Sequence, residues 1–272
     1  MGDNSRISWT MKTWNPFIGC RKVSAECEHC YAESMINRLR DTPEQKADGY
    51  KGLHAFDTVV RTKTMHDPIT WQKKAEAAGR YDLVFTCSLS DFFIQQADQW
   101  RPEIWRIIKA TPNLIYQILT KRPELIEKRL PPDWGVNGYP NCWLGTSVGM
   151  KKFLKRMDVL RKTPAHVRFV SAEPLLEDLC PELQAHIDGF HQIIVGGESG
   201  NNSDLYRPMD HNWARRILKI CRTHHIAYWF KQSSARKTEL GTQLAEIEGA
   251  APQTIQEYPA AYFAYKAAPK LF

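Results

Sequence analysis

The sequence predicts an α/β fold, a partial or complete (β/α) barrel of the TIM type, and three observations lead to this prediction. Short and nearly continuous apolar runs recur along the chain, as expected of parallel strands that are covered on both faces. Stretches with helical spacing of apolar residues separate these runs. The ends of successive runs lie about 30 residues apart, which is the length of one βα unit. A chain of 272 residues is long enough for one such barrel.

Six apolar runs are the candidate strands. Each is rich in β-branched or aromatic residues and is followed by a polar turn, which is typical of a buried strand in a parallel sheet. The runs cover residues 82–88, 113–120, 142–148, 167–173, 192–199 and 226–232. An additional strand within residues 7–15 would favour a barrel over a doubly wound sheet.

Helix signals lie between the candidate strands. Asp67 and Pro68 mark the start of a helix, and Gly79 ends the same helical pattern. Residues 101–110 carry isoleucines at helical spacing, and Asp210 is a candidate N-cap for an amphipathic helix that follows it. This alternation of strands and helices is what a parallel barrel requires.

Residues 151–162 carry six lysine or arginine side chains against one aspartate. The spacing of the apolar residues predicts an ordinary helix with a solvated basic face. A patch that contacts phosphate groups is the alternative. The stripe expected to face the core consists of Phe153, Leu154, Met157 and Leu160.

The rhythm of strands and helices predicts how the chain is divided. We expect a single barrel domain over residues 1–233. Residues near 38–66 fit the rhythm poorly and are expected to form an inserted loop that contacts substrate or a partner. Residues 234–272 are expected to form a C-terminal extension that packs on the barrel or trails from it.

The composition excludes two classes of protein. Hydrophobic residues make up 43% and charged residues 25%, close to the globular average, so long disorder is not the main state. No apolar run reaches spanning length and no signal-peptide pattern is present, so we expect a soluble, cytoplasmic protein without a membrane partner. The net charge of +7 is a modest bias toward an anionic partner such as nucleic acid or a nucleotide.

The strongest chemical signal is a cluster of three cysteines. Cys20, Cys27 and Cys30 have the spacing C-x6-C-x2-C, and the other four cysteines are scattered. One tight cluster in a reducing compartment predicts a metal site and not a disulfide framework. Three thiolates on a [4Fe–4S] cluster would leave one iron open for a small molecule. A zinc site completed by Cys87, His29 or a distant histidine is the alternative, and unliganded thiols are a third interpretation.

The cysteine cluster resembles that of the radical S-adenosylmethionine (radical SAM) superfamily, whose usual spacing is C-x3-C-x2-C. The second gap matches and the first is longer in this chain. More closely, the chain is similar to a family of phage and bacterial three-Cys-motif proteins of poorly defined function. The matching stretches are TWNPFIGC (13–20), C-x2-CYAE (27–33), LTKRPE (119–124), GTSV (145–148), SAEPLLEDL (171–179), GGESG (196–200), RPMD (207–210) and FKQ (230–232).

This resemblance implies a barrel of the radical SAM type that binds a [4Fe–4S] cluster through Cys20, Cys27 and Cys30. It implies S-adenosyl-L-methionine as the second cofactor, which the cluster would cleave reductively. The ligand carries a cationic amino group, an anionic carboxylate and ribose hydroxyls, so polar groups at the carboxyl ends of strands are candidates to bind it. We therefore expect cofactor contacts from His29, Tyr31, Ser88, Asp91, Ser147, Glu173 and Glu198.

Basic residues at the same strand ends are candidates for substrate binding. They are Lys121, Arg122 and Lys231. For the first two, a solvated turn is the alternative, and for Glu198 the alternative is a structural glycine turn. No residue is assigned a catalytic role.

The first functional hypothesis is a radical SAM-like enzyme that modifies or repairs a nucleic acid or nucleotide. It would need an electron donor and would have room for a partner protein. The second is a zinc-stabilised protein that binds nucleic acid or a partner without catalysis. The third is a hydrolase in which Glu173 and Glu198 act as paired carboxylates.

Overall fold

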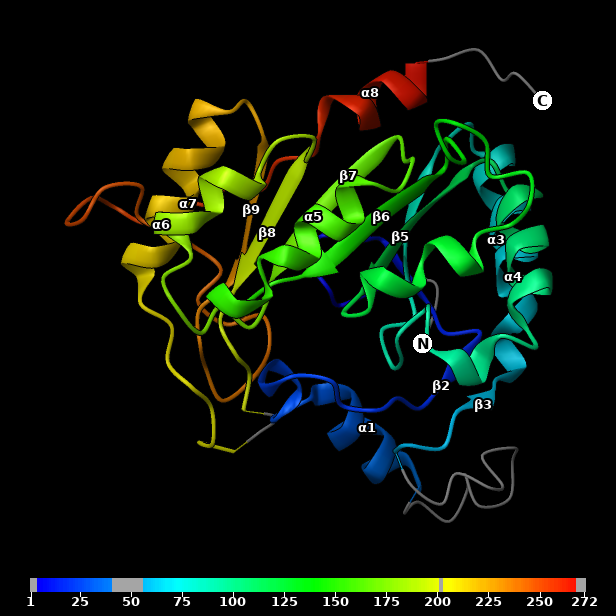
Figure 1. The fold of residues 1–272 in the computed structure, drawn as a ribbon, viewed down its shortest axis with the longest axis horizontal. Coiled ribbons are helices and arrows are strands. Elements are labelled where there is room, and N and C mark those ends of the chain that lie inside the picture. The colour runs from blue at the N-terminus through cyan, green and yellow to red at the C-terminus, as the bar shows by residue number, and fades with distance from the viewer. Residues whose placement is uncertain (1–3, 41–55, 201–202, 268–272) are drawn as a thin grey trace.

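The computed structural model describes residues 4–40, 56–200 and 203–267. Seven parallel strands form one curled sheet, a half-barrel in which β1 and β9 are the two edges (Figure 1). The predicted α/β fold with a partial (β/α) barrel is therefore confirmed. In sheet order the strands are β1 (Lys12–Trp14), β4 (Asp82–Thr86), β5 (Leu114–Thr120), β6 (Cys142–Ser147), β7 (Val167–Ala172), β8 (Gln192–Gly196) and β9 (Ala227–Gln232).

Each of the six predicted runs contains one of these strands, so these predictions are confirmed. Residues 7–15 contribute only the short strand β1. The residues before it form turns, in which the Thr10 amide donates to the Ile7 carbonyl at 3.2 Å and the Ser5 amide donates to the Met11 carbonyl at 2.9 Å. These turns bring Trp9 into the interior of the barrel, where it is buried.

Helices cover the outer face of the sheet, as a parallel barrel requires (Figure 1). The predicted helix starts are confirmed, although His66, and not Asp67, occupies the N-cap position of α3. Among the described residues, no helix has the length and apolar content needed to cross a membrane. The helices are α1 (Tyr31–Arg40), α3 (Asp67–Ala77), α4 (Arg101–Lys109), α5 (Lys155–Arg161), α6 (Cys180–Leu183), α7 (His211–Thr223) and α8 (Ala260–Ala267).

Short 3₁₀ turns connect several of these elements. The one that matters for the site is η1 (Ala25–Cys27), which lies in the cysteine cluster. The others are η2 (Lys63–His66), η3 (Gln95–Ala97), η4 (Pro123–Leu125), η5 (Glu127–Arg129), η6 (Lys151–Phe153) and η7 (Gln184–His186).

The sheet separates two apolar cores. The larger core lies between the strands and the covering helices, and it includes Leu154, Met157 and Leu160 of the predicted α5 stripe. The smaller core fills the inside of the curled sheet with large side chains such as Trp143 and Trp229. The inside of the curled sheet is therefore filled by side chains and is not a pore.

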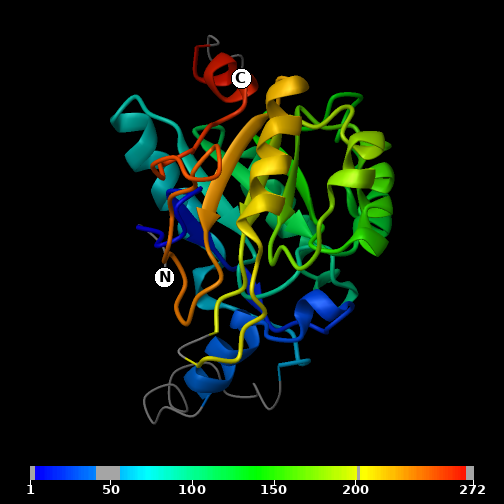
Figure 2. The ribbon, with the colours of Figure 1, turned by 90° about the vertical axis from the view of Figure 1, so that its left-hand side faces the viewer.

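The two ends of the barrel are closed by different parts of the chain. Helix α8 lies over the amino ends of the strands, where the Tyr262 ring packs edge-on against Trp143 with ring centres 6.0 Å apart. Helix α1 lies at the opposite end, beyond the carboxyl ends of the strands (Figures 1 and 2). The carboxyl end, called the mouth of the barrel below, is where ligand sites of this architecture gather.

The chain around the predicted insertion contains structure that the sequence did not predict. Strands β2 (Phe17–Ile18) and β3 (Val60–Arg61) pair antiparallel, and α1 follows Cys30 directly. Residues 41–55, the middle of the predicted insertion at 38–66, lie outside the described residues. After β9 the chain returns along this edge strand, where Gln256 forms a bridge with Trp229. The division into a barrel over 1–233 and an extension over 234–272 stays a prediction.

Candidate metal and ligand site at the mouth of the barrel

The three cysteines lie on one segment, residues 19–30, which we call the cysteine loop. It leaves strand β2 at Gly19 and enters helix α1 directly after Cys30. Cys20, Cys27 and Cys30 are all half-buried, and all seven cysteines of the chain are free thiols. The loop is held by groups that follow β4, β5, β6 and β8, so it lies across the mouth of the barrel.

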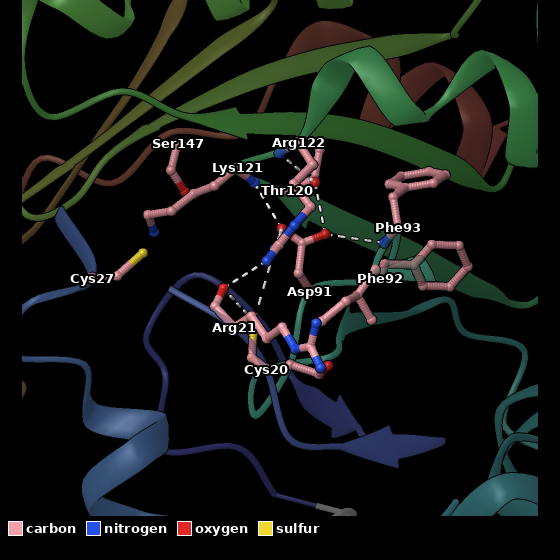
Figure 3. Close-up of polar contacts among 12 residues, drawn as sticks. Cys20, Arg21, Cys27, Asp91, Phe92, Phe93, Thr120, Lys121, Arg122 and Ser147 are labelled. Carbon is pink, nitrogen blue, oxygen red and sulfur yellow. Dashed lines mark hydrogen bonds and ion pairs between the residues drawn. The ribbon is translucent and has the colours of Figure 1, made fainter. Parts of the chain in front are cut away.

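Asp91 and Arg122 fasten the first part of the loop (Figure 3). Both side chains are buried, and Arg122 Nη1 lies 3.0 Å from Asp91 Oδ2. The same arginine donates to the Arg21 carbonyl at 2.6 Å and to Cys20 Sγ at 3.8 Å. Burial and the nearby Asp91 carboxylate raise the pKa of Cys20 to about 11, against the opposing effect of Arg122.

Asp91 also fastens the end of strand β5. Its oxygens accept from the Thr120 hydroxyl at 2.7 Å and from the Lys121 amide at 2.9 Å. The Phe93 amide donates to it at 3.0 Å. The carboxylate of Asp91 is therefore satisfied by protein groups, and the structure gives it a holding role at the mouth.

Cys27 lies in a different electrostatic environment from Cys20. Burial raises its pKa, but the Lys121 ammonium and hydrogen bonds from the Val23 and Ser24 backbone and the Ser24 hydroxyl outweigh burial, so the pKa is lowered. The Ser24 hydroxyl lies 3.6 Å from Cys27 Sγ. Figure 3 shows the Lys121 side chain directed toward Cys27. Cys27 therefore ionises more readily than Cys20.

Glu26 is the most deeply buried charge of the loop. Its side chain has no exposed surface, and its Oε2 accepts from Arg156 Nη1 of helix α5 at 2.6 Å. Its Oε1 accepts from the Gly149 amide at 2.5 Å. A Cβ at Gly149 would lie 1.8 Å from the Pro174 carbonyl oxygen, so only glycine allows the backbone to pass this close to Pro174. Arg156 also donates to the Ser147 carbonyl at 2.9 Å.

Glu198 and His29 meet on the other side of the loop. The His29 ring nitrogen Nδ1 lies 2.9 Å from Glu198 Oε2. Arg207 donates to the same oxygen from its backbone amide at 2.8 Å and from Nε at 3.0 Å, and its Nη2 pairs with the other oxygen. Arg207 Nη1 reaches the loop, where it donates to the Ala25 carbonyl at 3.1 Å and to Glu28 at 3.0 Å.

Tyr31 and Ser88 form a further contact between the loop and the barrel. The Tyr31 hydroxyl donates to the Ser88 carbonyl, although the residue as a whole is 39% exposed. The Ser88 hydroxyl exchanges hydrogen bonds with the buried side chain of Asn15, at 3.0 and 3.3 Å. Tyr31 thus packs beside Cys30 and joins α1 to the segment after β4.

Glu173 and Lys231 form an ion pair at the ends of β7 and β9. Lys231 Nζ lies 2.9 Å from Glu173 Oε1, and the side chains of Lys231 and Glu173 are 15% and 14% exposed, respectively. The Ser171 hydroxyl donates to the other carboxylate oxygen at 3.2 Å. This pair combines an anionic and a cationic group on the inner side of the mouth.

The ten predicted ligand-contacting residues thus fall into groups around the loop, and the structure gives most of them protein partners. Asp91, Lys121 and Arg122 form one group, and His29 with Glu198 forms another. Glu173 and Glu198 belong to separate ion pairs, whereas the hydrolase hypothesis pairs them with each other. Ser147 is buried at the end of β6, where its carbonyl accepts from Arg156.

Sequence reasoning missed three residues of this region. They are Glu26, Arg156 and Arg207. Arg156 lies in the run predicted to have a solvated basic face. The four lysines of the run are exposed as predicted, whereas the Arg156 guanidinium turns inward onto Glu26. Arg207 lies in the stretch RPMD, which marked the resemblance without giving a role. No local pattern identified Glu26, since its small neighbours Ala25 and Cys27 do not form an apolar run that would indicate burial.

The donor set of the cysteine loop is chemically suited to an iron–sulfur cluster. It offers three free thiols with cationic side chains beside them, and no disulfide competes for them. Within the described residues, no three His, Cys, Asp or Glu side chains lie close enough to share one metal ion. A [4Fe–4S] cluster binds each thiolate through a different iron, so its ligands need not converge on one point.

Comparison with known proteins places the chain in a family. A family model described as a protein of unknown function, DUF5131, matches residues 4–257. The chain belongs to the DUF5131 family. No curated protein matches it. The phage origin implied by the resemblance stays a prediction.

A solved structure of spore photoproduct lyase has the same fold as this DUF5131 protein. A single-substitution mutant of that enzyme superposes with a TM-score of 0.53 at 10% sequence identity, covering 88% of this chain and 79% of the other. A double mutant with bound AdoMet and dinucleoside spore photoproduct gives a TM-score of 0.48 at 13% identity, covering 81% of this chain and 63% of the other. The first likeness shows a shared fold, a partial (β/α) barrel.

Proposed function

We propose that this protein is a radical SAM-like enzyme. The cysteine loop would hold a [4Fe–4S] cluster through Cys20, Cys27 and Cys30, and the open iron would bind S-adenosyl-L-methionine. When bound, the cluster supplies the electron that cleaves the sulfonium C–S bond of that ligand. The substrate we propose is a nucleic acid or a nucleotide.

One observation carries the proposal. The cysteine loop lies across the mouth of a partial (β/α) barrel, because Asp91 with Arg122, Arg156 and Arg207 fasten it to the ends of different strands. Ligand sites of this architecture lie at that end of the barrel. The likeness in fold to spore photoproduct lyase supports the same placement.

The ion pair of Glu173 and Lys231 is suited to the methionine end of the ligand. The methionine part of the ligand would replace the Glu173–Lys231 ion pair by two contacts. Its amino group would bind Glu173, and its carboxylate would bind Lys231. Both side chains are already largely withdrawn from water, so part of the desolvation cost is met before binding. His29, on the loop, and Tyr31, the first residue of α1, flank Cys30 and would help to exclude water from the cluster.

The proposed substrate class depends on charge. The net charge of +7 favours a polyanion, and Lys121 at the mouth offers a cation beside Cys27. Spore photoproduct lyase, which shares the fold, is named for a photoproduct as its substrate. These observations together favour a nucleic acid or nucleotide over a neutral metabolite.

The test is anaerobic purification followed by metal analysis. We expect about four irons and matching sulfide per chain, a brown colour that dithionite bleaches, and production of 5′-deoxyadenosine from S-adenosyl-L-methionine. Anaerobic protein that holds one zinc and no iron after reconstitution would contradict the proposal. That result would favour the zinc-stabilised binding protein.

Cysteine variants give the matched control. Cys20→Ala, Cys27→Ala and Cys30→Ala should each lose the cluster spectrum and the 5′-deoxyadenosine. Cys180→Ser should keep both, because Cys180 lies outside the loop and its thiol donates to the Trp213 carbonyl at 3.8 Å, a contact that a hydroxyl can replace. Equal iron content in all four variants would contradict the assigned ligands.

A further inference from the structure

We propose that Arg122, Arg156 and Arg207 form a clamp that holds the cysteine loop in its binding position before any metal arrives. This inference rests on the proposed function, since it names the residues that position the cluster ligands. The three arginines come from the segments after β5, β6 and β8, so they fasten the loop at separated points. They touch the loop directly and act on the cluster only through it.

The first point of the clamp holds the Cys20 end. Arg122 is 7% exposed and is oriented by its ion pair with Asp91. From there it donates to the Arg21 carbonyl and to Cys20 Sγ. The Cys20 amide is fixed separately, because it donates to the Phe56 carbonyl at 2.8 Å. The position of Cys20 is therefore set by protein groups alone.

The second point holds the middle of the loop. Glu26 is fully buried and Arg156 is 11% exposed, so this pair lies in a region of low dielectric where each contact is strong. Two groups fix the Arg156 guanidinium in turn. Its central carbon Cζ lies 4.0 Å from the centre of the Phe153 ring, and its Nη1 donates to the Ser147 carbonyl. Since Glu26 immediately precedes Cys27, its anchoring restricts where that thiol can lie.

The third point holds the part of the loop on either side of Cys27, from Ala25 to His29. Arg207 is oriented by three donations to Glu198, and its remaining nitrogen reaches the Ala25 carbonyl and Glu28. The His29 ring adds a contact from the loop to the same carboxylate. Glu198 therefore connects the loop to β8 through two side chains.

The physical benefit of a clamp is a larger population of binding-competent loop. A loop without these contacts would sample many arrangements of its three thiols, and the apparent affinity of any ligand falls with the fraction of protein that is competent. Arginine suits this role better than lysine because its five donors can serve a carboxylate and a carbonyl at once.

The experiment uses the full chain and two readouts. The first is deuterium uptake by peptides that span residues 19–30 in metal-free protein. The second is the rate at which a chelator removes iron from anaerobically reconstituted protein. We expect faster uptake in Arg156→Met and Arg207→Met, and iron release faster by about 10- to 100-fold, the usual effect of removing a group that supports metal ligands.

Conservative variants separate positioning from general stability. The deuterium uptake and the iron release rate of Arg156→Lys should lie between those of wild type and Arg156→Met. Both contacts of Arg156 come from one nitrogen, which an ammonium group can replace. Asp98→Asn is the matched control, since Asp98 also holds two arginines, Arg101 and Arg129, but lies away from the loop. It should lower the melting temperature without changing uptake at residues 19–30 or the iron release rate.

The outcomes distinguish the clamp from the proposed function. Folded Arg156→Met and Arg207→Met with wild-type uptake and wild-type iron release would overturn the clamp. If a methionine variant does not fold, the lysine variants of the same arginines decide by the same two readouts. If the wild-type protein takes up no iron, the proposed function fails, and deuterium uptake in metal-free protein still decides whether the clamp exists.

Discussion

Lys231 and Glu173 meet across strand β8, above Gly196. Their charged atoms lie 2.9 Å apart, although their strands, β9 and β7, are not neighbours in the sheet. A Cβ at Gly196 would lie 2.6 Å from Glu173 Oε1. The absence of a side chain at this position is therefore what allows the pair to form at the inner side of the mouth.

Removing either charge of this pair should weaken the binding of S-adenosyl-L-methionine. We expect Lys231→Met and Glu173→Gln each to raise the dissociation constant by about 10- to 100-fold, the value of one hydrogen bond to a charged group. Gly196→Ala should weaken binding in the same direction because its Cβ displaces the carboxylate. Calorimetric titration of the reconstituted protein measures the change. The exposed Lys237→Met should bind normally, and equal affinity in all variants would contradict a ligand contact.

The stability of the protein should depend on pH through Glu198. Burial raises the pKa of this carboxyl, but the hydrogen bonds from Arg207 and His29 outweigh burial and leave the pKa below its ordinary value. A depressed pKa in the folded state adds stability above the pKa of the unfolded state, about 4.3, and that stability is lost as the pH falls through the folded value. Wild type should therefore exceed Glu198→Gln in urea stability at pH 7, and the difference should shrink by about pH 3. A difference of equal size at both pH values would contradict this origin.

The thiols of metal-free protein should react at different rates. Because the pKa of Cys27 is lowered and that of Cys20 is raised to about 11, Cys27 holds more thiolate near neutral pH. We expect iodoacetamide to modify Cys27 at least about 10-fold faster, as followed by mass spectrometry of the peptides. Lys121→Met should slow the alkylation of Cys27 at about pH 7.5 but less at about pH 9.5, since loss of the cation raises the pKa of Cys27. Lys128→Met, an exposed control, should leave the rate unchanged.

Gly145→Ala should destabilise the barrel. A Cβ at this position would lie 2.4 Å from the Phe169 ring inside the sheet, where the surrounding side chains are buried. Overpacking of a core costs about 1–3 kcal/mol, so the urea midpoint should fall by the corresponding amount. The double variant Gly145→Ala with Phe169→Leu should lose less unfolding free energy than the sum of the losses in the two single variants. The smaller leucine side chain makes room for the added methyl group. Strict additivity would contradict the close approach of these two positions.

The strands were predictable because their signal is local. A parallel strand covered on both faces must carry an apolar run, and each of the six runs contains a strand in the structure. Asp210 was recognised as an N-cap for the same reason, and its carboxylate accepts from the Asn212 amide at 2.8 Å. The short strands β2 and β3 escaped notice, because two-residue strands are too short to show a period.

The clamp was not predictable, because its contacts join residues far apart in the chain. Arg156 meets Glu26 across 130 positions, and Arg207 meets Ala25 across 182. In the sequence, Arg156 is one more cation on a basic helix, with nothing to distinguish it from the exposed Lys155. Its direction is set by where α5 packs against β6, which is a property of the assembled barrel.

The sequence by itself determined the alternation of strands and helices, the three thiols on one short segment, and the polar groups that end each strand. These features depend on residue type and spacing within a few positions, which the chain carries before it folds. Only the tertiary structure decided that the cysteine loop crosses the mouth of the barrel and that Glu198 accepts hydrogen bonds from Arg207. Burial and partner choice arise when distant segments exclude water from a common volume, and that volume exists only in the folded barrel.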